Sequence, residues 1–70
     1  MRSLKEVLFD EALYWKDEAR RLEKELGEYD YLTSIAQSKY NALLNVVNNS
    51  GYLPEWDNFI KSIAIKRGII

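Results

Sequence analysis

Apolar side chains recur at alternating spacings of four and three residues along the first third of the chain. The series, here called the heptad seam, begins with Leu8, Ala12, Trp15, Ala19, Leu22 and Leu26. A heptad repeat is typical of helices that pack side by side at a shallow angle. Ser3 followed by Glu6 forms a capping box that can start such a helix. The pattern therefore predicts a first helix over residues 3–26.

The heptad seam continues beyond Gly27 without a change of phase, through Tyr29, Thr33, Ala36, Tyr40, Leu43 and Val47. Two structures are compatible with this continuity. In a helical hairpin the chain turns after Gly27, and a capping box of Ser34 and Gln37 starts a second helix over residues 34–50. In one long bent helix, Gly27 lies in the interior at a cost of about 1 kcal/mol relative to alanine. We favour the hairpin over the long helix.

Antiparallel pairing of the two predicted helices sets small side chains opposite large ones. It places Ala12 opposite Val47 and Ala19 opposite Tyr40, an alternation that dense packing requires. We therefore expect the two alanines to be buried where the helices approach most closely. On the solvent side, Asp17 and Arg21 have the i,i+4 spacing of a helical ion pair.

A third helix is indicated after a glycine stop. Gly51 followed by Tyr52 fits a helix end in which the tyrosine folds back on the preceding helix. Leu53 precedes a proline and is expected to be extended, and Pro54 then opens a helix over residues 54–67 at its first position. The predicted fold is all-α: a helical hairpin, or one long bent helix, followed by a short C-terminal helix with coiled-coil-like packing. It forms a single small domain over residues 1–70.

The composition argues against an enzyme. The 70 residues include no cysteine and no histidine, so disulfides, zinc sites of the usual type and the commonest general base are excluded. The three glycines stand apart from one another, and none belongs to a phosphate-binding loop. We expect no catalytic residues, no cofactor and no metal.

The charge balance points away from nucleic acid. The formal net charge is −1, whereas a nucleic-acid-binding domain is usually clearly basic. The chain starts with charged residues where a signal peptide would need an apolar run, and its longest uncharged stretch is too short to span a bilayer. We therefore expect a cytoplasmic protein that does not enter a membrane.

Several apolar and aromatic residues fall outside the heptad seam and are candidates for binding a partner. Tyrosine and tryptophan are favoured at protein interfaces because they combine a large contact area with a polar tip. Burial under the third helix is the competing interpretation for the stripe of Phe9 and Leu13 and, above all, for Trp56. The candidate partner-binding residues are Phe9, Leu13, Tyr14, Tyr29, Tyr31 and Trp56, with the cations Lys61 and Arg67 at the rim.

These features favour a small protein–protein interaction module that binds and regulates or inhibits a larger protein. The composition is in the style of phage or mobile-element products. Since a core of this size supplies only about 3–5 kcal/mol without other reinforcement, we also expect a homo-oligomer, with a dimer favoured. One alternative is a structural or scaffolding protein assembled through the coiled-coil seam. A weaker one is a nucleic-acid-binding regulator that uses the C-terminal helix.

Overall fold

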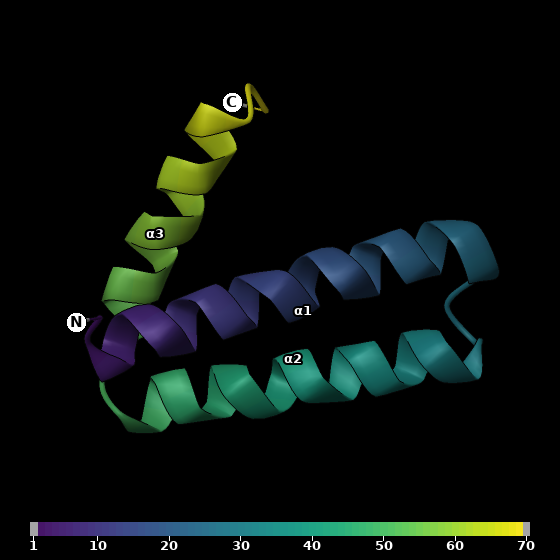
Figure 1. Cartoon of the computed structure of the whole chain (residues 1–70), viewed down its shortest axis with the longest axis horizontal. Coiled ribbons are helices and arrows are strands. Elements are labelled where there is room, and N and C mark those ends of the chain that lie inside the picture. The colour runs from purple at the N-terminus through teal and green to yellow at the C-terminus, as the bar shows by residue number, and fades with distance from the viewer. Residues whose placement is uncertain (1, 70) are drawn as a thin grey trace.

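The chain forms three helices joined by two short turns. The computed structural model describes residues 2–69 and contains α1 (Leu4–Leu26), α2 (Tyr31–Asn49) and α3 (Leu53–Lys66), with no strand in that range. Helices α1 and α2 pack closely along their length as an antiparallel hairpin, while α3 starts beside the N-terminal end of α1 and points away from the hairpin (Figure 1). The hairpin is confirmed, and the single long helix is excluded.

The turn between α1 and α2 begins at Gly27, which has a φ of 91°. Side chains with a Cβ rarely adopt this backbone conformation, so the glycine ends α1. The second helix then starts earlier than predicted, because the carboxylate of Asp30 accepts a hydrogen bond from the amide of Leu32 at 2.9 Å. The predicted capping box of Ser34 and Gln37 is wrong: aspartate caps as well as serine, and Ser34 already lies inside the first turn of α2.

Thr33 fixes this turn from within the hairpin. Its side chain has no exposed surface, and its hydroxyl donates to the carbonyl of Gly27 at 2.9 Å. The same carbonyl accepts from the amide of Asp30 at 3.3 Å. The buried hydroxyl is therefore satisfied, and the loop is bound to the first turn of α2.

The second turn is a Schellman motif, as predicted. The amide of Gly51 donates to the carbonyl of Asn48 at 3.1 Å, and that of Tyr52 donates to Val47 at 3.0 Å. One detail of the prediction is wrong, because Leu53 is the first residue of α3 rather than an extended residue. Pro54 consequently occupies the second helical position, where its missing amide is still not needed for a helical hydrogen bond.

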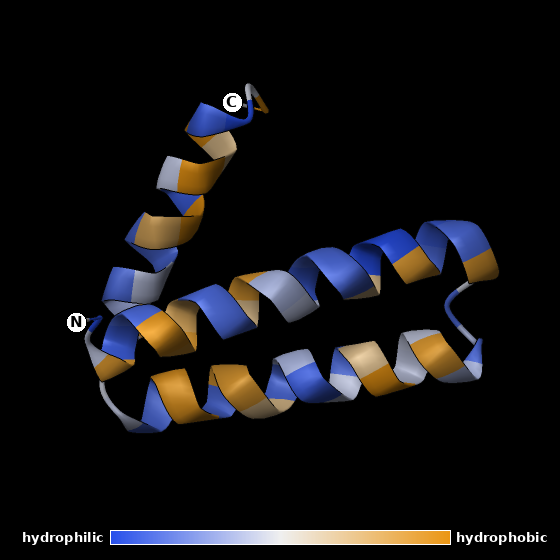
Figure 2. Cartoon of the chain, in the orientation of Figure 1, coloured by the Kyte–Doolittle hydropathy of each residue, from blue (hydrophilic) through white to orange (hydrophobic). Residues whose placement is uncertain are grey.

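The core lies where α3 packs on the end of the hairpin that is opposite the turn at Gly27. Phe9, Ala12, Val47 and Trp56 are buried there, and Phe59 packs against them. The Phe9 ring lies 5.4 Å from the Trp56 ring, with the two planes at 72°, an edge-to-face contact that aromatic pairs favour. Figure 2 shows apolar bands on α1 and α2 at this end of the hairpin, and further apolar bands along α3 and towards the turn between α1 and α2.

The other half of the hairpin is held by small residues. Ala19 and Ala36 are buried at 7% and 1% exposure, and Ala19 lies near the half-buried Tyr40. Ala12 has no exposed surface, and the predicted burial of Ala12 and Ala19 is confirmed. Within residues 2–69, no third helix covers this half.

Two ion pairs connect α3 to α1 outside the core. Lys5 pairs with Glu55 at 2.9 Å, and Arg67 binds Asp17 with two hydrogen bonds of 2.9 Å each. The predicted pair of Asp17 with Arg21 is wrong: the fork of Arg67 engages both oxygens of Asp17, while Arg21 instead binds Glu18 and Glu25.

Candidate protein-interaction surfaces

Two of the predicted partner-binding residues belong to the core. Phe9 is 6% exposed and Trp56 is 3% exposed, since each packs against the other and against Phe59. A partner cannot reach them unless α3 is displaced, so their assignment to a binding surface is wrong and the core interpretation holds.

Leu13 and Arg67 meet in a groove between α1 and α3. The groove has a volume of about 200 Å³ and is lined by Leu13, Lys16, Asp17, Arg20, Ile60, Ile63, Ala64, Arg67 and Ile69. The Arg67 guanidinium lowers the pKa of Asp17 by hydrogen bonding, against the opposing effect of partial burial. Since Arg67 is already paired within the chain, Lys16 and Arg20 are the cations of this groove that remain for another molecule.

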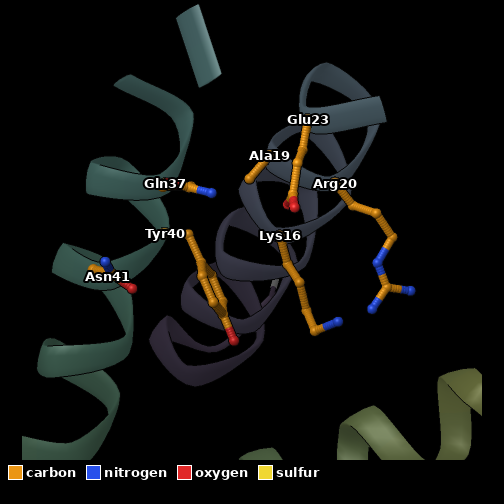
Figure 3. Close-up of a pocket in the computed structure, with 7 residues that line it drawn as sticks. All are labelled: Lys16, Ala19, Arg20, Glu23, Gln37, Tyr40 and Asn41. Carbon is orange, nitrogen blue, oxygen red and sulfur yellow. The ribbon is translucent and has the colours of Figure 1, made fainter. Parts of the chain in front are cut away.

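A second hollow lies between α1 and α2 on the same side and has a volume of about 330 Å³. Figure 3 shows its lining: Lys16, Ala19, Arg20 and Glu23 from α1, with Gln37, Tyr40 and Asn41 from α2. Burial raises the pKa of Tyr40, and the contact with the Trp56 indole partly offsets this effect. Most of the lining is polar and open to solvent.

Within residues 2–69, no cluster of acidic side chains is placed to hold a metal ion.

The turn between α1 and α2 presents a different kind of surface, here called the hairpin tip and formed by Leu26, Tyr29, Tyr31 and Leu32. Tyr29 is 92% exposed and Tyr31 is 77% exposed, and the two leucines are about half exposed. The structure thus brings Tyr29 and Tyr31 together as predicted candidates. It adds Leu26, the last residue of α1, and Leu32, which the Asp30 cap places in the first turn of α2.

The remaining predicted residues lie away from the hairpin tip. Tyr14 is 54% exposed on α1, with its ring edge-on to Trp15 at 5.0 Å. Lys61 is exposed on α3, which leaves the hairpin at the opposite end from the tip (Figure 1). Arg67 is held at Asp17 in the middle of α1. Lys61 and Arg67 therefore do not form a rim around the tyrosines, and that part of the prediction is wrong.

A further apolar surface lies on the hairpin side opposite α3. At 100° per residue, Phe9 and Leu13 turn towards α3, whereas Trp15 and Leu22 turn to the other side. The same argument for α2 adds four apolar residues and one cation, Lys39. We call this surface the open face and define it by Trp15, Leu22, Leu32, Ile35, Lys39, Leu43 and Val46.

Sequence reasoning missed the open face because all its α1 members belong to the heptad seam and were expected to be buried. Trp15 and Leu22 are instead half-buried at the edge of the open face, and Val46, a member of the face on α2, is 48% exposed. The ammonium group of Lys39 lies 5.0 Å from the centre of the Trp15 ring, a cation–π contact between the two helices. Within residues 2–69, no part of the chain covers this side of the hairpin.

Comparison of the chain with protein-family models, with curated proteins and with solved structures gives no match. No helix within residues 2–69 has both the length and the apolar character needed to cross a bilayer. The surfaces described above are therefore the basis for assigning a function.

Proposed function

We propose that this chain is a non-enzymatic protein-binding module, which places its hairpin tip in a pocket of a larger protein and thereby regulates or inhibits it. The observation that carries the proposal is the exposure of Tyr29 and Tyr31, at 92% and 77%, on a turn that hydrogen bonds hold in place. A phage or mobile-element origin, in keeping with the composition, is part of the same proposal.

The fixed turn makes these tyrosines suitable binding anchors. The Gly27 carbonyl accepts hydrogen bonds from Thr33 and Asp30, so the tip is ordered before any partner arrives. A preordered surface loses less conformational entropy on binding than a flexible one, and more of the contact energy is retained as affinity. Buried tyrosine anchors dominate many interfaces, with truncation costs of about 2 kcal/mol or more.

The charge around the hairpin tip indicates the kind of pocket that it fits. Glu25, Glu28 and Asp30 flank the exposed tyrosines, and Lys24 is the nearest cation in sequence. A pocket with an apolar floor and a rim of lysine or arginine would complement this arrangement, and the opposite charges would speed the encounter. We therefore expect the target to present a basic rim.

Affinity capture with quantitative mass spectrometry tests the proposal. The tagged chain serves as bait in a lysate of its source cells, in parallel with Tyr29→Ala/Tyr31→Ala and with Tyr14→Ala as the matched control. We expect one protein to be enriched by the parent and by the control but not by the double variant. Titration of that purified protein should then show at least about a thirtyfold loss of affinity, which corresponds to one lost anchor.

The control separates binding from folding. All the replaced tyrosines are exposed, so the free energy of unfolding of each variant should lie within about 0.5 kcal/mol of that of the parent. A double variant that stays folded and captures the same protein at parental affinity would show that the hairpin tip is not the binding surface.

A further inference from the structure

The open face is an apolar surface that no element within residues 2–69 covers. It combines half-buried seam residues with Leu32 and Val46, which are 52% and 48% exposed. The molecule is 34 Å long and each helix is about 10 Å wide, so the whole side of the hairpin to which the open face belongs has an area on the order of 600 Å². Two such faces packed together would bury roughly 1,200 Å², which reaches the range of stable specific interfaces.

We propose that a second copy of this chain covers the open face, with α1 of each copy packed against α2 of the other in an antiparallel four-helix bundle. The two-fold axis would run parallel to the helices. This arrangement keeps each residue of one copy level with its counterpart in the other. The inference does not depend on Tyr29 and Tyr31, which stay exposed at the end of the bundle. Leu32 belongs to both surfaces.

Charge complementarity supports this occupant. The pairing of α1 with α2 brings Ala19 beside Tyr40, so Glu18 and Lys39 lie at nearly the same level along the hairpin. Glu18, which also binds Arg21 of its own copy, borders the open face on the α1 side, and Lys39 lies on its α2 side. When α1 of one copy faces α2 of the other, each Lys39 meets a Glu18 from the second copy, and two such pairs form by symmetry.

The alternative two-fold arrangement is disfavoured by the same charges. An axis perpendicular to the helices would place α1 against α1 in opposite directions. Glu11 of one copy would then lie near Glu18 of the other, and like charges at an interface oppose association. The distribution of charge thus selects the arrangement in which α1 contacts α2.

Sedimentation equilibrium of the full chain tests the interface. We expect the parent to be a dimer at micromolar concentration and Val46→Glu to be a monomer, because the new carboxylate would be buried between the copies. Ile65→Glu is the matched control: Ile65 is 64% exposed on α3, outside the open face, and its replacement should leave the dimer intact. A monomeric parent, or equal association of the two variants, would overturn the proposal.

Charge reversal tests the arrangement of the helices. Lys39→Glu and Glu18→Lys should each weaken the dimer about tenfold, and the double variant should return to within about threefold of the parent. Glu18 and Glu25 both form an ion pair with Arg21. Glu25→Lys removes one of these pairs without changing Glu18, and it should leave association unchanged. If Glu18→Lys strengthens the dimer instead, α1 faces α1 and the proposed arrangement is wrong.

The two proposals fail separately. Val46→Glu should abolish the dimer while the chain still captures a target through the hairpin tip. The double tyrosine variant should lose the target and remain a dimer. A target that binds the open face of a monomeric chain would overturn the second-copy proposal.

Discussion

The two ends of the hairpin are built from one repeating pattern but are stabilised in different ways. At the end where α3 docks, Phe9 and Trp56 fill a core between three helices. In the half of the hairpin towards the tip only two helices meet, and Ala19, Thr33 and Ala36 are buried there. Large apolar area holds the first end together, whereas close approach and hydrogen bonds hold the second.

This difference shows that a heptad seam alone does not determine how a helix pair is stabilised. Where the seam is flanked by the apolar stripe of Phe9 and Leu13, a further helix can cover it. Where polar residues flank it, as around Glu23 and Gln37, the hairpin remains two helices wide. The residues beside the seam therefore decide where the core forms.

The largest effect is expected from Trp56→Ala. Removing this 3%-exposed ring from the aromatic core should cost about 3–5 kcal/mol, which is comparable to the whole stability of a chain of this size. Circular dichroism should show loss of the cooperative melt at room temperature. Tyr29→Ala is the control and should melt like the parent; if Trp56→Ala melts within a few degrees of it, the α3-covered end is not the dominant core.

A smaller effect is expected at the other end from Thr33→Val. The change keeps the shape of the side chain but removes the hydroxyl that donates to Gly27, at a cost of about 1 kcal/mol. Urea unfolding should detect this loss, and amide exchange at Asp30 should accelerate. Thr33→Ser retains the hydroxyl and should keep the slow exchange. Unchanged exchange in Thr33→Val would contradict the role assigned to this hydrogen bond.

The smallest effect concerns the ion pair that connects α3 to the middle of α1. Hydrogen bonding to Arg67 lowers the pKa of Asp17 below its ordinary value of 3.8. The pair therefore contributes stability above the unfolded pKa, and this contribution is lost as the pH falls through the lower folded value. Because the Asp17 side chain is 43% exposed, the contribution should stay below about 1 kcal/mol and decrease with salt.

Melting of Asp17→Asn alongside the parent between pH 2 and pH 7 measures this contribution. The difference in melting temperature between Asp17→Asn and the parent should be largest at neutral pH and should vanish in acid. Glu23→Gln is a suitable control, because Glu23 forms no ion pair within residues 2–69. A difference that persists at the lowest pH would mean that the substitution acts through packing rather than charge.

Much of the fold follows from local sequence signals. The cap at Ser3, the Schellman turn at Gly51 and the change of direction at Gly27 are all encoded within a few residues. The start of α2 is not encoded so locally, because Asp30 and Ser34 are both good caps and only the buried contact of Thr33 with Gly27 selects the first. Such a contact depends on the hairpin already being formed.

The candidate surfaces were less predictable for the same reason. An aromatic side chain looks alike in sequence whether it lies in a core or on a surface, and Trp56 and Tyr29 differ only in what packs against them. The ion pair of Asp17 with Arg67 joins residues separated by 50 positions, and no local spacing rule could favour it over the nearer Arg21. Exposure therefore has to come from the structure.

The docking of α3 has a consequence for the order in which the chain folds. The hairpin brings together residues that are near in sequence around Gly27, whereas α3 makes contacts with α1 across almost the whole chain. Contacts near in sequence cost less loop entropy, so the hairpin should close first and α3 should dock last. The same helix should be the first to detach, exposing Phe9 and making the connection around Tyr52 the preferred site of cleavage by a protease.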